Sequence, residues 1–402
     1  MINLINYIKI FEGGAAGHMA HPYDYAEFTG NDLIEFIDDL FSGKIEHMKE
    51  KLDGFNIEAT KNNNNEVVFI RNNGDRNSEK GGMDIEDIKT KWEGKQQQQK
   101  TFLTAATTIT KIFEKVDKKF FNPDETHRKI INCECIVEGN TNIVPYASDR
   151  VAFHGYKVYE LNGQKWIAKE DVEGNVEELY KAAEGIDQAK PRPDLVINSQ
   201  ETANKLAEKF KKEVTKLWKN EKLELTANIN DWRHTRYVKF APDWMKNDND
   251  IFNRLFNEDK SVNLGTLKKR YPEHMSELST IDKDKDFIDK VNDPLSNLFL
   301  EIGNEAIDIM DGFVNSGAKD KTITSLKNEL SATISLVNKN GNEADKKKLM
   351  KALERIKMLG DKLNTAEGIV IVYKGRRMKL TGSFAPLNQA LGLRFNYKPN
   401  EQ

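Results

Sequence analysis

The chain has 402 residues, of which 38% are hydrophobic and 31% are charged, and its formal net charge is −3. This length is enough for a catalytic domain and a second module. No apolar run approaches the length of a membrane span, and residues 1–11 lack the apolar centre of a signal peptide. We therefore expect a cytoplasmic protein without membrane contact. The acidic balance excludes a generally basic nucleic-acid binder, so any such surface must be local.

The predicted elements give a mixed α+β pattern with largely antiparallel strands. Residues 12–30 are expected to form an irregular loop, followed by a helix that Asn31 caps. A second helix is expected at 102–121, after a loop that includes Gln96 to Gln99. Short runs of strand character predict strands at 55–60, 66–72, 129–137, 151–160, 164–169, 367–373 and 376–381.

From Pro191-Arg192-Pro193 onward the chain is mostly helical until 364, with four apolar stripes at helical spacing. We therefore expect a catalytic domain at 1–190 and 365–402, interrupted by a helical insertion at 191–364. The insertion is expected to pack as an independent module. A tight hairpin around Lys374-Gly375 closes the catalytic sheet.

The only cysteines, Cys133 and Cys135, are two residues apart on a predicted strand and point to one face. They are expected to pack behind the sheet without a disulfide or a metal, which places Glu134 on the opposite face, toward a pocket. Basic residues concentrate near the end of the chain. Between Asn342 and Lys398 there are 13 Lys or Arg and 5 Asp or Glu, with a cluster at Lys346 to Lys348.

The first candidate catalytic segment is Lys51-Leu52-Asp53-Gly54, at the start of a predicted strand. A lysine amine is a nucleophile toward a nucleoside triphosphate when it is deprotonated and the phosphate charge is neutralised. Gly54 allows a close backbone approach. Further along, Arg377 and Lys379 are two residues apart on one strand and so address one face, as two cations around a phosphate should.

Together with Arg71, Glu134 and the Glu367-Gly368-Ile369-Val370 segment, this ordered series resembles the covalent nucleotidyltransferase superfamily of ATP-dependent DNA and RNA ligases and mRNA capping enzymes. The resemblance covers residues 45–160 and 365–382. It implies a nucleotidyltransferase (ATP-grasp-like ligase) catalytic domain of antiparallel sheets and helices. It also implies an ATP-dependent polynucleotide ligase that forms a lysyl-AMP, adenylylates a 5′-phosphate end and seals it to a 3′-OH, with Mg²⁺ or Mn²⁺ as cofactor.

The resemblance also implies roles for single residues. Lys51 would be the nucleophile, and Glu367 would support the metal together with Glu134, which in the family binds ribose or metal. Arg71 would contact the ribose and the 5′ phosphate, although Gly74 lies one residue later than the family pattern. The remaining nucleotide contacts would come from Glu50, Asp53, Gly54, Phe153 (stacked on adenine), Arg377 and Lys379.

Several alternatives stay open at this point. Glu138-Gly139 offers a competing register for Glu134, Lys157 stands where the family has an acidic residue, and Arg377 stands where it has a lysine. Only 23 residues follow Lys379, too few for the OB-fold of DNA ligases and capping enzymes, so RNA ends are favoured over nicked DNA. The rivals are an inactive nucleotidyltransferase-fold protein that binds nucleic acid or belongs to a virion, and a GTP-dependent capping guanylyltransferase.

The sequence contains two weaker signals. His18, His21 and Asp24 could bind zinc, but their spacing is not diagnostic, a fourth ligand is absent, and loop capping is the favoured interpretation. Gly13 to Met19 and Phe384-Ala385-Pro386 resemble segments of tailed-phage proteins, which would place the protein in the host cytoplasm. We expect a monomer.

Overall fold

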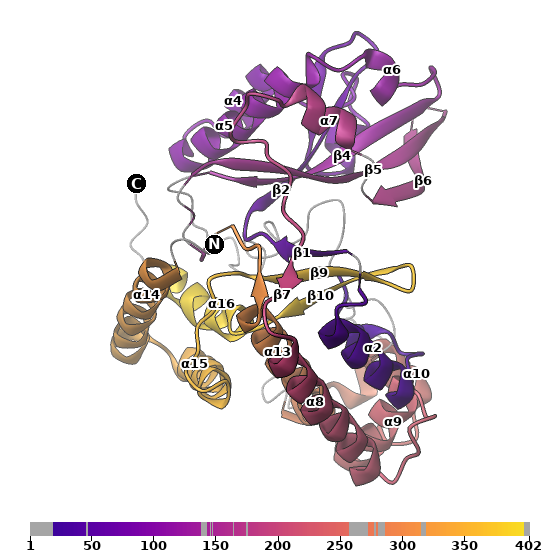
Figure 1. The fold of residues 1–402 in the computed structure, drawn as a ribbon, viewed down its shortest axis with the longest axis vertical. Coiled ribbons are helices and arrows are strands. Elements are labelled where there is room, and N and C mark those ends of the chain that lie inside the picture. Colours follow the sequence, from indigo (N-terminus) through magenta and orange to yellow (C-terminus); the bar gives the residue numbers. More distant parts are fainter. Residues whose placement is uncertain are drawn as a thin grey trace.

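The protein folds into two lobes, seen one above the other in Figure 1. The computed structural model describes residues 19–45, 47–137, 143–144, 146, 148–163, 165–173, 176–256, 272–276, 279, 286–314 and 319–397. Residues 13–18 and the Glu138-Gly139 alternative lie outside these residues. None of the described helices combines the length and apolar character that a membrane span requires.

The upper lobe is a five-stranded sheet, covered on one face by helices (Figure 1). The strand order is β3-β2-β4-β5-β6, and all neighbouring strands are antiparallel. The strands are β2 (Phe55–Lys61), β3 (Val67–Ile70), β4 (His127–Ile136), β5 (Arg150–Asn162) and β6 (Lys165–Glu173), and the helices are α3 (Asn73–Arg76), α4 (Ile85–Lys91), α5 (Gln96–Phe113), α6 (Lys118–Phe121) and α7 (Glu177–Ala182).

The lower lobe is built around a three-stranded antiparallel sheet, β1-β9-β10, in which strands from both ends of the chain meet. These strands are β1 (Met48–Lys51), β9 (Gly368–Tyr373) and β10 (Arg376–Thr381). The other elements of this lobe are η1 (Pro22–Asp24), α2 (Gly30–Ser42), β7 (Val196–Ile197), α8 (Gln200–Asn220), α9 (Ile229–Phe240), α10 (Asn249–Phe256), η2 (Pro272–His274), α13 (Asp286–Asp308), β8 (Met310–Asp311), α14 (Lys319–Asn340), α15 (Glu343–Met358), α16 (Phe384–Gly392) and η4 (Leu393–Asn396).

The α+β class and the antiparallel sheets agree with the sequence patterns. The β9–β10 hairpin turns at Lys374 and Gly375, which both have positive φ (48° and 72°), as a tight primed turn requires. One boundary differs clearly. Helix α5 begins at Gln96 and ends at Phe113, so the glutamine run forms its first turn. A short α6 then follows, with Asp117 as its cap.

The helical segment 191–364 does not pack as an independent module. One hydrophobic core contains Phe36 of α2, Phe210 of α8, Phe299 of α13, Ile371 of β9 and Met378 of β10. The α8 and α13 helices of the expected insertion therefore cover the sheet to which the first and last strands contribute. The upper lobe is formed by residues near 52–190, and the lower lobe by the rest. The amphipathic helices of the lower lobe need an apolar surface to cover, and the β1-β9-β10 sheet supplies it.

This shared core predicts that one residue of the helical segment stabilises the whole lower lobe. Phe299 is fully buried against Tyr23 and Phe36. Phe299→Ala should therefore lower the free energy of unfolding by about 3–5 kcal/mol, whereas Val238→Ala on an exposed helix position should change it by less than about 0.5 kcal/mol.

Denaturant unfolding with separate probes for the helices and for the β1-β9-β10 sheet would check this. Both probes should show the same shifted transition. If the midpoint of the helical transition shifts while that of the sheet transition does not, the helical segment is an independent module.

Candidate functional site

The centre of the candidate site is an ion pair between Lys51, the last residue of β1, and Glu367, which immediately precedes β9. The Lys51 Nζ donates directly to Glu367 Oε1. The side chains are 23% and 10% exposed. The antiparallel register, in which Lys51 lies opposite Gly368, brings together two residues 316 positions apart. The structure therefore joins the expected nucleophile to the expected metal-supporting carboxylate.

One face of the three-stranded sheet carries the cations. Met378 and Leu380 of β10 point into the hydrophobic core, so the alternating Arg377 and Lys379 point away from it. On β1, Met48 faces the core and Lys51 points with them to the other face. Electrostatic effects confirm the proximity. Lys379 opposes the rise in the pKa of Glu367, and Arg377 opposes the rise in the pKa of Glu134.

The opposing face of the five-stranded sheet presents Glu134. Cys133 and Cys135 are fully buried in the core beneath α5, as expected, and Glu134 between them points to the other side. Its carboxylate lies close enough to raise the pKa of Lys51. Burial raises the pKa of Glu134, and the positive charges of Lys51 and Arg192 oppose this rise. The site thus lies between two sheets, with cations mainly on one and Glu134 on the other.

Two residues that the sequence analysis missed hold Glu134 in place. The His154 Nε2 lies 3.3 Å from Glu134 Oε2, and its Nδ1 lies 2.8 Å from Arg192 Nη2. An arginine has only donors, so Nδ1 must accept and Nε2 must carry the hydrogen that faces Glu134. Arg192 also donates to the backbone carbonyl of Glu50, at 2.6 Å, beside Lys51. Arg192 therefore ties the two lobes together at the site.

Asp53 and Gly54 organise the backbone beside Lys51. The Asp53 carboxylate accepts from the N–H groups of Ile143 (2.6 Å) and Val144 (2.8 Å). A Cβ on Gly54 would lie 2.6 Å from the carbonyl oxygen of Cys135, so this position excludes larger side chains. Glycine is required here because the backbone at Gly54 approaches the backbone of β4. Burial and the charge of Glu367 raise the pKa of Asp53 to about 7.

Glu50 does not face the site. It shares the core side of β1 with Met48, its side chain is fully buried, and its Oε2 accepts from the N–H of Val314 at 2.5 Å. Its Oε1 has no hydrogen-bond partner among the described residues. The expected contact between the Glu50 side chain and a nucleotide is therefore wrong, because the two-residue period of β1 turns Glu50 away from Lys51.

Phe153 also lies on the wrong face for its expected role. It pairs with Cys133, and its ring packs in the core against Phe113 and Tyr180, with centroid distances of 6.1 and 5.2 Å. Only 3% of the residue is exposed. It cannot stack on a base placed between Lys51 and Glu134. The next residue, His154, points to the opposite face, toward Glu134, and the register shift of β5 lies at this position.

Arg71 lies just after β3, beside helix α5. Its guanidinium donates to the carbonyl oxygen of Asn56, the cross-strand partner of Glu134, and lies 5.2 Å from the Phe102 ring. Outside the site, the Asp24 carboxylate accepts from the backbone N–H of His21 at 2.8 Å, and the His21 ring stacks on Tyr23. This supports loop capping for His21 and Asp24; His18 lies outside the described residues.

The carboxylates fit a weakly held divalent cation. The described residues contain no group of three or more His, Cys, Asp or Glu side chains arranged around a common metal position. Mg²⁺, however, is usually bound by one or two carboxylates, with waters and substrate phosphates as the other ligands. Burial and the charge of Glu134 raise the pKa of Glu367, so the two carboxylates are a suitable pair.

Lys51 is held as an ammonium group. Burial lowers its pKa, but the carboxylates of Glu367 and Glu134 raise it more, and the net pKa is above the ordinary value. Attack on a triphosphate requires the deprotonated amine. The structure shows Arg377 and Lys379 nearby, but the direct partner of Lys51 is an acid. Neutralising Glu367 is therefore the step that would activate this amine.

The contact between Arg192 and His154 gives a prediction. Burial and the positive charge of Arg192 hold the pKa of His154 well below its usual range. Arg192→Gln removes that charge, which favours the imidazolium form, so the pKa of His154 should rise. The control Arg150→Gln changes a residue that contacts the same segment, at Lys190 and Pro191, and should leave His154 unaffected.

Imidazole nitrogen NMR as a function of pH would measure both variants, and in the parent protein should show a neutral ring protonated at Nε2. An unchanged pKa in Arg192→Gln would mean that the contact with Nδ1 is absent in solution.

The buried Glu50 gives a prediction about stability. Burial raises its pKa from 4.5 to about 7. The folded state therefore holds a proton that the unfolded state releases between these pH values, and stability falls as pH rises through this window. Glu50→Gln should raise the free energy of unfolding at pH 8 relative to the parent, by up to about 3 kcal/mol, and change it little at pH 4.

Denaturant unfolding at the two pH values would test this, with exposed Glu178→Gln as the control. Equal effects of Glu50→Gln at both pH values would contradict a proton held on Glu50.

Comparisons with family models, with curated proteins and with solved structures give no match for this chain. A functional assignment must therefore rest on the chemistry of the site: a lysine paired with a glutamate, a second carboxylate on the facing sheet, and cations on β10.

Proposed function

We propose that this protein is an ATP-dependent polynucleotide ligase that passes through a lysyl-AMP intermediate. The observation that carries the proposal is the Lys51–Glu367 pair, with Glu134 facing it and with Arg377 and Lys379 on the same sheet face. Each of these residues comes from the motif series that resembles the nucleotidyltransferases. The structure brings them together from segments far apart in the chain.

The proposed first step is attack by the Lys51 Nζ on the α-phosphorus of ATP. A nitrogen–phosphorus bond forms, the bond to the bridging oxygen breaks, and its electron pair leaves with pyrophosphate. The ammonium group must first release a proton to solvent, because Glu367 raises the pKa of Lys51. Arg377 and Lys379 would stabilise the charge that develops on the phosphoryl group.

A divalent cation would bind to Glu134 and Glu367 and supply positive charge for the triphosphate. When Glu367 is neutralised in this way, it no longer raises the pKa of Lys51. The protein's own groups do the positioning: His154 and Arg192 orient Glu134, and Asp53 anchors the backbone at Ile143 and Val144.

In the later steps, the AMP would pass to the 5′ phosphate of an RNA or nicked-DNA end, and a 3′-OH would displace it. Arg71, which donates to the carbonyl oxygen of Asn56, would contact that phosphate.

The first step can be tested by incubation with labelled ATP and Mg²⁺, followed by intact mass. One adenylyl group should be added, and the label should be acid-labile. Lys51→Arg keeps a positive partner for Glu367 but has no nucleophilic amine, so it should fold normally and take no label.

Lys44→Ala, an exposed lysine just before β1, should label like the parent protein. A label that survives in Lys51→Arg, or one that GTP alone supplies, would overturn the assignment.

A further inference from the structure

Two amide side chains lie beside Glu134 on the same face of the five-stranded sheet. Asn56 of β2 is the cross-strand partner of Glu134, and Asn132 precedes Glu134 by two residues on β4. Ile57 and Cys133, which follow the two asparagines, are buried under α5, so the asparagines point to the other face. Opposite residues in antiparallel strands have Cβ atoms about 5 Å apart, and residues two apart on one strand are about 6.6 Å apart. Both amides are therefore within reach of a ligand that contacts Glu134.

These two side chains, the amide pair, bond to each other and still have hydrogen-bonding groups to offer. Asn56 Nδ2 donates to Asn132 Oδ1. Each amide has an acceptor oxygen and a nitrogen with two donors, so the pair keeps at least one donor and one acceptor whichever amide donates in this contact. Both residues are partly exposed, and in the part of the chain that the structure describes neither side chain makes another hydrogen bond.

The sheet face beyond the amide pair is closed by a buried ion pair. Glu58 is the cross-strand partner of Asn132, and its Oε2 accepts from Arg76 Nη2 at 2.8 Å. The Arg76 and Glu58 side chains are only 7% and 2% exposed. A ligand at the amide pair is therefore confined to the side of Glu134.

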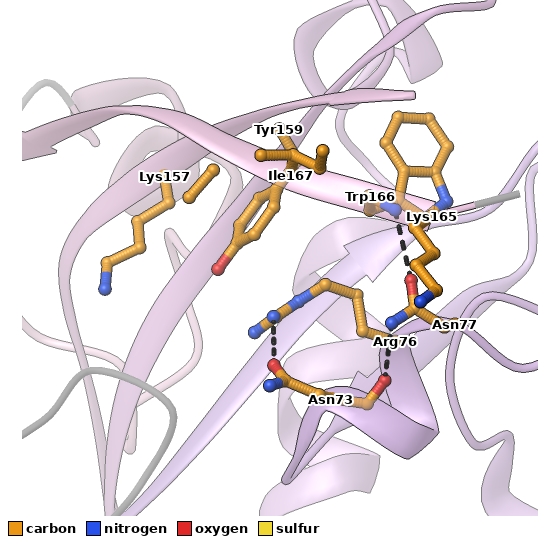
Figure 2. A pocket seen from close by; sticks show the side chains of 9 residues that line it. Asn73, Arg76, Asn77, Lys157, Tyr159, Lys165, Trp166 and Ile167 are labelled. Atoms are coloured by element: carbon orange, nitrogen blue, oxygen red, sulfur yellow. Dashed lines mark hydrogen bonds between the residues drawn. The ribbon is translucent and has the colours of Figure 1, made fainter. Parts of the chain in front are cut away.

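The amides on the far side of this ion pair are already engaged by the protein. They line a cavity of about 540 Å³ between β5, β6 and α3, which Arg76 borders (Figure 2). The oxygen of Asn73 accepts from Arg76 at 2.7 Å, and the oxygen of Asn77 accepts from the backbone N–H of Trp166 at 3.0 Å. This contrast makes the amide pair the better candidate for a ligand contact.

The donor and the acceptor of the amide pair suit two neighbouring hydroxyl groups. A ribose hydroxyl both donates and accepts, so the 2′ and 3′ hydroxyls can meet a donor and an acceptor at the same time. A nucleobase would instead need a flat apolar surface on which to stack. The neighbours of the amide pair on this face, Glu58 and Glu134, are acidic, and the ring of Phe153 lies in the core on the opposite face.

A nucleotide that reacts at Lys51 would carry its ribose to this part of the site. The phosphorus that the lysine amine attacks is joined through one oxygen to the 5′ carbon of its own sugar. Glu134 is close enough to Lys51 to raise its pKa. The sugar of the reacting nucleotide is therefore expected beside Glu134, where the amide pair lies.

We propose that Asn56 and Asn132 bind the hydroxyl groups of a ribose and so select a ribonucleotide over a deoxyribonucleotide. The inference rests on the proposed function for the source of this ribose, which is ATP or the 5′-phosphorylated end of an RNA strand. The two asparagines determine specificity and take no part in making or breaking bonds.

The test is equilibrium binding of AMP, 2′-deoxy-AMP and 3′-deoxy-AMP, measured by calorimetry. AMP has no pyrophosphate to release, so no covalent step intervenes. The parent protein should bind AMP about tenfold more tightly than either deoxy form, as expected for the loss of one hydrogen bond. The combined variant Asn56→Ala, Asn132→Ala should bind all three nucleotides equally.

The control combines Asn64→Ala with Asn162→Ala, which removes two exposed amides from the same lobe, and should keep the preference of the parent protein. If the combined variant Asn56→Ala, Asn132→Ala does not fold, each single variant carries the test. Each should lose the preference over one of the two deoxy forms.

A second experiment identifies the source of the ribose. A 5′-phosphorylated RNA oligomer and a DNA oligomer of the same sequence are compared by fluorescence anisotropy in the parent protein and the combined variant. Loss of the preference for AMP assigns the ribose to ATP, and loss of a preference for RNA alone assigns it to the strand. Either result supports recognition of a ribose.

Two results would overturn the inference. The first is a parent protein without a preference for AMP over its deoxy forms or for RNA over DNA. The second is a combined variant that keeps these preferences, or that loses affinity for all three nucleotides by the same factor, since the amides would then contact the base or the phosphate. The ligase proposal fails separately, if the parent protein prefers AMP but takes no adenylyl group from ATP.

Discussion

The contact between Lys51 and Glu367 is the constraint on which the arrangement of this protein depends. A partly buried lysine and glutamate are costly to desolvate, and either one alone would leave an uncompensated charge. They meet only if β9, near the end of the chain, pairs with β1, near its beginning. That pairing depends in turn on the core in which α2, α8 and α13 cover the other face of the sheet. The helices therefore support the site without touching it.

The two lobes meet at the same place. One connection, Leu52 to Gly54, leads from β1 directly into β2, and Gly54 packs against the backbone of β4. The return connection passes through Arg192, which bonds to the Glu50 carbonyl in one lobe and to His154 in the other. Any change in the angle between the lobes must therefore alter the distance between Glu134 and the Lys51–Glu367 pair. This makes the site sensitive to the relative position of the two sheets.

The sequence predicted the parts of this site that follow from a two-residue period within one strand. Arg377 and Lys379 alternate with buried Met378, and Glu134 lies between buried cysteines. The same period, applied to Met48 and Glu50, would have placed Glu50 in the core. Phe153 and His154 were not predictable in this way, because a register shift in β5 breaks the alternation. Arg192 lies in a proline-flanked loop, where no periodicity indicates what a side chain will contact.

The proposed function requires an acidic chain to bind a polyanionic substrate. Total charge is a poor guide here, since several lysines on the described helices pair with acids one turn away. What matters is which charges share one surface. On the site face, Arg377 and Lys379 of β10 act on the carboxylates of Glu134 and Glu367, and these carboxylates in turn raise the pKa of Lys51. The electrostatic character of the site is therefore set by this local group of charges and not by the sum over the chain.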